Sequence, residues 1–98
     1  MAKYQVTCVH KPNRNSTHEH ITHIGGVVEG KRWNITREEA IRQIENNING
    51  FYVVDANDST KVSVVGVVRP AFGHAYLRTY ADGYWNNNLL SLAECLLA

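Results

Sequence analysis

Hydrophobic and polar residues alternate along several short stretches of this chain, a period of two that is typical of β-strands. The first stretch covers residues 3–10, where the apolar side chains of Tyr4, Val6 and Cys8 occupy alternate positions. We expect further strands over residues 18–25, near 33–35, and over 51–54, 61–69 and 74–79. The glycine pair 25–26 predicts a bulge or a bend, and Gly66 predicts a β-bulge.

One stretch has the period of an α-helix instead. Thr36 and Glu39 stand at the spacing of a capping box, in which the threonine hydroxyl accepts the amide of the third residue after it. Ala40, Ile41 and Ile44 follow and form an apolar stripe along one face. We expect the main helix over about residues 37–48. A second capping box, Ser91 to Glu94, predicts a short helical turn that carries Cys95, Leu96 and Leu97.

These elements predict an α+β fold in which one helix packs on one face of an antiparallel sheet of about five strands, followed by a C-terminal helical turn. With 98 residues, 44% of them hydrophobic and 19% charged, the chain has the size and composition of a single folded domain, residues 1–98. No apolar run approaches the roughly 18–20 residues that span a bilayer, and the N-terminus lacks the apolar core of a signal peptide. We therefore expect a cytoplasmic protein without a membrane partner.

The two cysteines, Cys8 and Cys95, stand near opposite ends of the chain. The termini of small domains are often close in space, so a disulfide between them is one alternative. The other is a pair of reduced thiols that behave as small hydrophobic side chains. Because no secretion signal accompanies the cysteines, we expect the reduced form.

Motifs in the last quarter of the chain resemble a known family. Residues 76–79 (Tyr-Leu-Arg-Thr), Asp82-Gly83 and residues 87–95 are similar to the C-terminal signature of the bacterial and phage domain-of-unknown-function 3892 family. The first strand, residues 21–26 and Trp33 ahead of the helix agree with it. Ala93 departs from the pattern, since family members often have proline there. The resemblance implies the architecture and the cytoplasmic location, but no activity and no cofactor.

The same polar C-terminal segment holds the candidate functional residues. In a structural interpretation, its Asp and Asn side chains hydrogen-bond backbone amides, and Arg78 pairs with Asp82 to brace a loop. In a functional interpretation, Tyr84 and Trp85 are exposed anchors of a recognition loop, because aromatic and Arg side chains dominate binding hot spots. The leading hypothesis is a non-enzymatic binding or regulatory domain that contacts another protein. Its candidate residues are Arg78, Asp82, Tyr84, Trp85, Asn87 and Asn88.

Nucleic acid is the second partner class that the sequence suggests. The formal net charge is only +1, so a strong electrostatic footprint for a phosphate backbone is missing. The positive charges do concentrate toward the N-terminus. A nucleic-acid-binding face would use the exposed side of the first strands, with Lys3, Lys11, Arg14, Lys31 and Arg32.

A metal site or a small enzyme is the third alternative. Thiolate and imidazole are zinc ligands, and alternation along two neighbouring strands would allow a site made of Cys8, His10, His18 and His20. A cysteine beside His74 would be the start of a nucleophilic pair. However, the Cys-x₂-Cys spacing of zinc knuckles, paired carboxylates and a phosphate-binding glycine loop are all missing from the sequence. We therefore expect a protein that is not an enzyme and holds no metal or cofactor.

Overall fold

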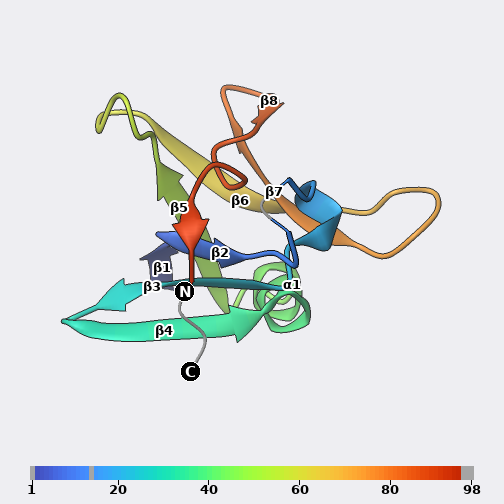
Figure 1. Cartoon of the computed structure of the whole chain (residues 1–98), viewed down its shortest axis with the longest axis horizontal. Coiled ribbons are helices and arrows are strands. Elements are labelled where there is room, and N and C mark those ends of the chain that lie inside the picture. The colour runs from blue at the N-terminus through green and yellow to red at the C-terminus, as the bar shows by residue number, and fades with distance from the viewer. Residues whose placement is uncertain (1, 14, 96–98) are drawn as a thin grey trace.

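The computed structural model describes residues 2–13 and 15–95, which form two β-sheets, one α-helix and one turn of 3₁₀-helix (Figure 1). Sheet A has five strands in the order β1-β5-β6-β7-β8, and sheet B has four in the order β4-β3-β2-β9. In chain order the elements are β1 (Ala2–Gln5), β2 (Cys8–His10), η1 (His18–His20), β3 (His23–Val28), β4 (Lys31–Thr36), α1 (Arg37–Glu45), β5 (Asn49–Val54), β6 (Val62–Val68), β7 (Tyr76–Ala81), β8 (Tyr84–Asn86) and β9 (Ala93–Glu94).

The α+β class is confirmed, but the expectation of a single antiparallel sheet is wrong. The expected first strand divides into β1 and β2, which belong to different sheets. The amide of Val6 donates to the carbonyl of Tyr52 in sheet A at 2.8 Å, and the amide of Thr7 donates to Gly25 in sheet B at 2.9 Å. The chain thus passes from one sheet to the other between two adjacent residues. Moreover, β1 pairs with β5 and β9 pairs with β2 in parallel.

The core lies between the two sheets and the helix. Its buried members come from both sheets, from α1 and from the segments around them, because each strand turns one of its two faces inward. Tyr4, Trp33 and Phe51 bring three aromatic rings together at its edge, with centroids 5.7–6.3 Å apart. The buried apolar residues are Val6, Val9, Ile21, Ile24, Ala40, Phe51, Val53, Val65, Leu77 and Leu89.

Helix α1 begins where the capping box places it. Thr36 is the N-cap, and its Oγ1 accepts the amide of Glu39 at 3.1 Å. Ile41 and Ile44 pack against the core, as the apolar stripe predicts. The helix ends at Glu45, earlier than expected, since Asn46 is the C-cap and Asn47 takes a positive φ of 55°.

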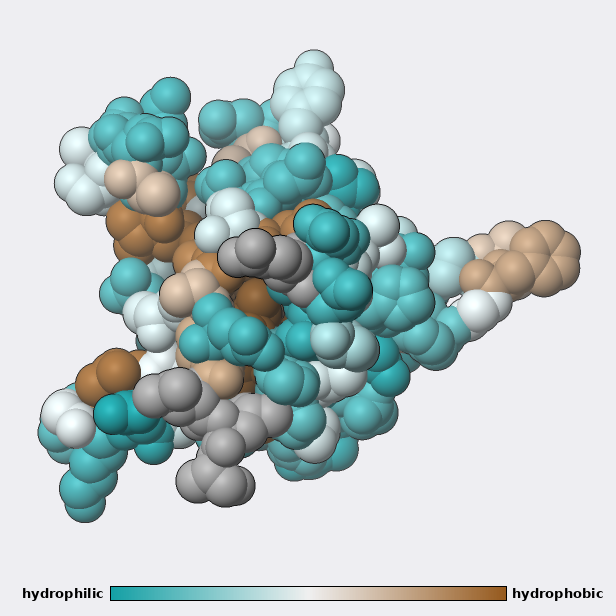
Figure 2. Space-filling view, viewed as in Figure 1, coloured by the Kyte–Doolittle hydropathy of each residue, from teal (hydrophilic) through white to brown (hydrophobic). Residues whose placement is uncertain are grey.

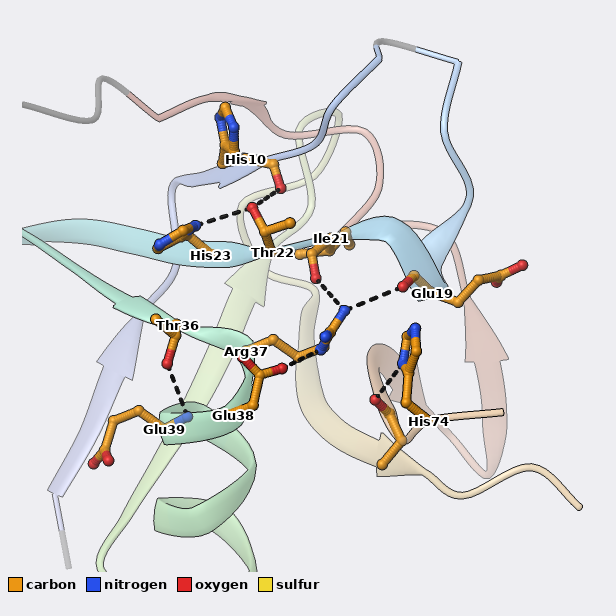
Figure 3. A network of polar contacts seen from close by, with 11 residues as sticks. His10, Glu19, Ile21, Thr22, His23, Thr36, Arg37, Glu38, Glu39 and His74 are labelled. Atoms are coloured by element: carbon orange, nitrogen blue, oxygen red, sulfur yellow. Dashed lines mark hydrogen bonds and ion pairs between the residues drawn. The ribbon is translucent and has the colours of Figure 1, made fainter. Parts of the chain in front are cut away.

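The expected strand over residues 18–25 is also wrong in its first half. Residues 18–20 form η1, while β3 starts at His23 and continues through the glycine pair without a bend. The Arg37 guanidinium supports the intervening segment, because Nη1 donates to the carbonyl oxygens of Glu19 at 3.3 Å and Ile21 at 3.4 Å (Figure 3). The first turn of α1 is thereby tied to the connection between η1 and β3.

The C-terminal segment differs most from expectation. Residues 93–94 form strand β9 beside β2, not a helical turn, and the expected helical positions Leu96 and Leu97 lie outside the described residues. Because β9 lies in register with β2, the Cα atoms of Cys8 and Cys95 are 4.8 Å apart, and the two side chains form a disulfide. The expectation of two reduced thiols is therefore wrong for this structure. Within the described residues, no helix has the length and apolar character needed to cross a membrane.

Adjacent valines on β6 test the assignment of the two faces of sheet A. Val65 is 2% exposed, whereas Val64 is 45% exposed. We expect Val65→Ala to lower the free energy of unfolding by about 2–3 kcal/mol, because it removes buried methyl groups and leaves a cavity. Val64→Ala, the same change one residue earlier, should cost less than about 1 kcal/mol. Equal losses in chemical denaturation would contradict the face assignment.

The start of α1 should contribute a pH-dependent part of the stability. Arg42 and Gln43 donate hydrogen bonds to the Glu39 carboxylate and lower its pKa from 4.5 to about 2. A depressed carboxyl pKa stabilises the folded state above the unfolded-state value, and this contribution is lost as the pH falls toward about 2. The denaturation midpoints of the wild type and Glu39→Gln should therefore differ more at pH 6 than at pH 2. A difference that stays constant over this range would contradict the assignment.

Candidate functional site

The face of sheet A that points away from the core carries a continuous row of apolar side chains. Tyr52 on β5 stands opposite Val64 on β6, Val64 stands opposite Tyr80 on β7, and Tyr80 stands opposite Trp85 on β8. Paired residues of neighbouring strands project to the same side of a sheet. We call these four residues, Tyr52, Val64, Tyr80 and Trp85, the outer row.

Three of the four outer-row residues are open to solvent to an unusual degree for large apolar side chains, whereas Tyr52 is half-buried. Val64, Tyr80 and Trp85 are 45%, 40% and 47% exposed, and Val62, two residues along β6, is 48% exposed. The row lines a groove of about 730 Å³ that runs across sheet A to Ile44 in the last turn of α1 and to Asn47 just after the helix. Scattered exposed apolar residues are ordinary, whereas a contiguous group on one face is typical of an interaction surface.

A glycine allows the two rings of the row to lie against the sheet. The Tyr80 and Trp85 rings meet edge to face, with centroids 5.4 Å apart. A Cβ atom at Gly66 would lie 3.0 Å from Tyr80 and 3.3 Å from Trp85, which is tighter than normal packing. Gly66 pairs regularly with Arg78, so the expected bulge is not formed. The glycine instead leaves space for the ring pair.

Beneath the row, on the inward face, a polar network fixes the position of β8. Asn86 and Asn88 each donate to Ser63 Oγ, at 2.9 and 3.0 Å. Thr79 is fully buried, and its hydroxyl donates to Asn86 Oδ1 at 2.5 Å while it accepts the Leu89 amide at 3.2 Å. Because β8 has only three residues, its backbone hydrogen bonds to β7 are few, and these side-chain hydrogen bonds help to hold it in place.

The expected pair between Arg78 and Asp82 is absent among the described interactions. Arg78 donates from Nε to the Asn86 carbonyl and from Nη2 to Asn87 Oδ1, each at 3.2 Å. Asp82 lies with Gly83 in the two-residue turn between β7 and β8, where both have positive φ, 53° and 82°. Such backbone angles at both central residues define the type I′ turn of tight hairpins. The sequence signal for a turn at Asp82-Gly83 is thus confirmed.

All six candidate residues of the sequence lie on the β7–β8 hairpin or directly after it. They separate by role, since Arg78, Asn87 and Asn88 make internal hydrogen bonds while Tyr84 is 78% exposed and Trp85 belongs to the outer row. Sequence reasoning missed the rest of the row. The sequence of β6 could have revealed it, because its valines stand at both odd and even positions and so place apolar groups on both faces of the sheet. The row residues missed were Tyr52, Val64 and Tyr80.

Charges of both signs border the groove. Lys3 on β1 lines it directly. An adjoining hollow of about 750 Å³ shares Val64 and Tyr80 with the groove and is also lined by Lys61, Asp55 and Asp82. The border therefore combines two cations with two carboxylates, an arrangement that favours no single sign of partner charge.

The residues of the proposed basic face come from different elements of the described structure. Lys3 lies on β1 in sheet A, whereas Lys31 and Arg32 lie on β4, an edge strand of sheet B. The Lys11 ammonium donates to the Leu90 carbonyl at 3.3 Å. Arg14, the remaining member, lies outside the described residues.

The residues of the suggested metal site are not arranged to share an ion. Cys8 is consumed by the disulfide with Cys95, which also removes either thiol as a nucleophile beside His74. His18 and His20 belong to η1, not to a strand face, and burial lowers the pKa of His18, with a further contribution from the Arg78 guanidinium. Among the residues that the structure describes, no group of three or more His, Cys, Asp and Glu side chains could hold a metal ion.

Comparison of the sequence with known proteins assigns the chain to a family. The model of the family described as protein of unknown function, DUF3892, matches residues 5–93, nearly the whole chain. The chain belongs to the DUF3892 family. No curated protein and no solved structure matches it. The resemblance noted in the sequence is thereby confirmed. Because the description of the DUF3892 family names no activity, a function for this chain has to be argued from its geometry.

The polar network under the outer row makes a prediction for this DUF3892 protein. Thr79→Val preserves the shape of the side chain but leaves the buried Leu89 amide and Asn86 Oδ1 without the hydroxyl. We expect a loss of about 1–3 kcal/mol in the free energy of unfolding, the usual penalty for an unsatisfied buried group. Thr60→Val, the same change at an exposed hydroxyl, is the matched control. Denaturant titration that gives both variants the same stability would show that the network does not hold β8.

Proposed function

We propose that this protein is a non-catalytic binding domain that recognises another protein through the outer row of sheet A. The observation that carries the proposal is the exposure of Val64, Tyr80 and Trp85 in register on three adjacent strands. Burial of such a row on association would remove apolar surface from water, which is the main driving force of most protein interfaces.

The residue types of the outer row support a protein partner. Tyr and Trp are enriched at interface hot spots because they contribute large contact areas at a low cost in side-chain entropy. The row is also held rigid from below, since the network of Ser63, Thr79 and Asn86 positions β8 before any partner arrives. A preformed surface loses little conformational freedom on binding, and this raises affinity for a given area.

The charges around the groove favour protein over nucleic acid. A phosphate backbone requires several cations on one surface, and affinity for it rests on the counterions that they release. Here Asp55 and Asp82 offset Lys3 and Lys61 near the row. Single-stranded nucleic acid could still stack its bases on the exposed rings, so the experimental test includes it as a competing outcome.

The proposal is tested by truncation of the two rings that meet over Gly66. Wild-type protein, Tyr80→Ala/Trp85→Ala and Phe72→Ala are immobilised at equal density and exposed to native extract, and the retained proteins are quantified. The loss of two hot-spot rings should reduce capture of a specific partner by more than about tenfold. Phe72 is the matched control, because it is an aromatic residue that is 91% exposed but does not line the groove. Its loop, between β6 and β7, projects from the body and has apolar surface at its tip (Figure 2).

Capture that is lost in the double variant and kept in Phe72→Ala supports the proposal. Equal capture by all three proteins contradicts it, provided that thermal unfolding shows the double variant to be folded. A labelled single-stranded oligonucleotide that binds the wild type, with affinity that falls steeply as salt rises, would replace the protein partner with nucleic acid. In that case Lys3→Ala should weaken the oligonucleotide complex.

A further inference from the structure

The last described strand is attached to the rest of the protein by few contacts. Strand β9 pairs with β2 over only two positions, Cys8 with Ala93 and Val9 with Glu94. The Cys95 amide adds one hydrogen bond to the Val9 carbonyl at 3.0 Å. The side chains of Ala93 and Glu94 are exposed, so they bury little apolar surface. Such a short strand gains little from its ladder alone.

Two side-chain contacts supplement this pairing, and they differ greatly in strength. A Glu94 carboxylate oxygen lies 3.1 Å from His10 Nδ1, but the Glu94 side chain is 67% exposed, so water screens the pair. The disulfide between Cys8 and Cys95 is covalent. Cys95 is also the one residue of the segment 93–95 that is buried, with 6% exposure. The disulfide is therefore the principal attachment of this segment to β2.

The disulfide lies against the backbone of sheet B, where a glycine provides the space for it. A Cβ atom at Gly25 would lie 3.0 Å from the Cys8 sulfur and 3.1 Å from the Cys95 sulfur, and 2.6 Å from the Trp33 carbonyl oxygen. No side chain fits there without displacing the β4 backbone. The absence of a side chain at Gly25 thus leaves space for the disulfide, although the disulfide is not enclosed by the core.

One side of the disulfide opens to solvent. A hollow of about 220 Å³ is lined by both cysteines, by Gly26 and by the side chains of Arg32 and Glu94. A small dithiol can approach the sulfurs through this opening. The hollow thus brings one cation, Arg32, and one carboxylate, Glu94, to the approach to the sulfurs. A cation close to a sulfur favours the thiolate that forms in thiol–disulfide exchange, and a carboxylate opposes it.

We propose that the Cys8–Cys95 disulfide is a redox latch that holds residues 93–95 on β2 and releases them when a dithiol reductant reaches it through the hollow. A thiolate of the reductant attacks one sulfur, the second cysteine leaves as a thiolate and takes up a proton, and the second thiol of the reductant completes the exchange. The reductant becomes a disulfide, and Cys8 and Cys95 become two thiols. A disulfide oxidant reverses the reaction.

Release uncovers the outer edge of β2 and leaves the outer row in place. The backbone groups of β2 that face β9 lose their partners, and sheet B gains an open edge of the kind that accepts an added strand. The segment just before the latch stays anchored, because Leu89 is fully buried and its amide is bound by Thr79. The latch therefore acts on sheet B independently of the proposed recognition surface on sheet A.

Hydrogen exchange of the full-length protein before and after reduction tests the latch. The oxidised protein is treated with dithiothreitol under native conditions, and thiol titration confirms two free cysteines per chain. We expect exchange in the C-terminal peptide and in the peptide that contains β2 to accelerate by at least about tenfold, while peptides from β6 and β7 keep their protection. Cys8→Ser/Cys95→Ser should behave like the reduced protein and ignore dithiothreitol.

Four results would overturn the proposal. Unchanged exchange after complete reduction means that β9 stays docked without the bond. Loss of protection throughout the chain means that the bond staples the whole fold and does not act as a local latch. Disulfides that react with dithiothreitol only in denaturant mean that the hollow does not admit the reductant. Re-oxidation of the reduced sample by oxidised glutathione should restore the original exchange pattern, and failure to restore it also counts against a reversible latch.

Discussion

The passage of the chain from one sheet to the other at Val6 and Thr7 is the constraint on which the rest of the structure depends. Two consecutive amides donate in different directions, one to Tyr52 in sheet A and one to Gly25 in sheet B. The two sheets are thereby joined at a fixed point, with Val6 itself in the core between them. Once the inner face of sheet A is committed to this core, the period-two alternation of β6 and β7 fixes which side chains remain outside.

The outer face that results is apolar although it is not buried. Val62, Val64, Tyr80 and Trp85 would normally be replaced by polar residues on the solvent side of an antiparallel sheet. These side chains lie beside a glycine that makes room for two rings and above a network that fixes β8, as in the contact surface that we propose. The asparagines of the C-terminal segment serve the structural role that the sequence allowed for them, and Trp85, directly before them, faces outward. The structural interpretation thus describes the asparagines, and the functional interpretation of the exposed aromatic residues stays a proposal.

The sequence predicted features that depend on a few neighbouring residues. The start of α1 follows from Thr36 and Glu39, and the hairpin turn follows from Asp82 and Gly83, because caps and tight turns are decided locally. The division of the first strand was not predictable, since alternation continues across Val6 and Thr7 with no sign of a change of sheet.

Features set by long-range contacts were missed for the same reason. Strand β9 has two residues and gains its identity only from pairing with β2, more than eighty positions earlier. The disulfide follows from that pairing, and the expectation of a cytoplasmic protein argued against it. The candidate site was found only in part. Trp85 stands out in the sequence as an aromatic residue in the polar C-terminal segment, whereas Tyr52 and Tyr80 become neighbours of the groove only through sheet register.

Hydroxyl-radical labelling of the free protein and of its complex with a captured partner tests the central claim most directly, because it measures solvent access to each ring. The account predicts that Tyr80 and Trp85 are labelled readily in the free protein, that the half-buried Tyr52 is labelled less, and that all three become protected together in the complex, while labelling of Phe72 does not change. Labelling of the outer row that is the same in both states, with protection elsewhere, would contradict the claim that this face of sheet A is the recognition surface.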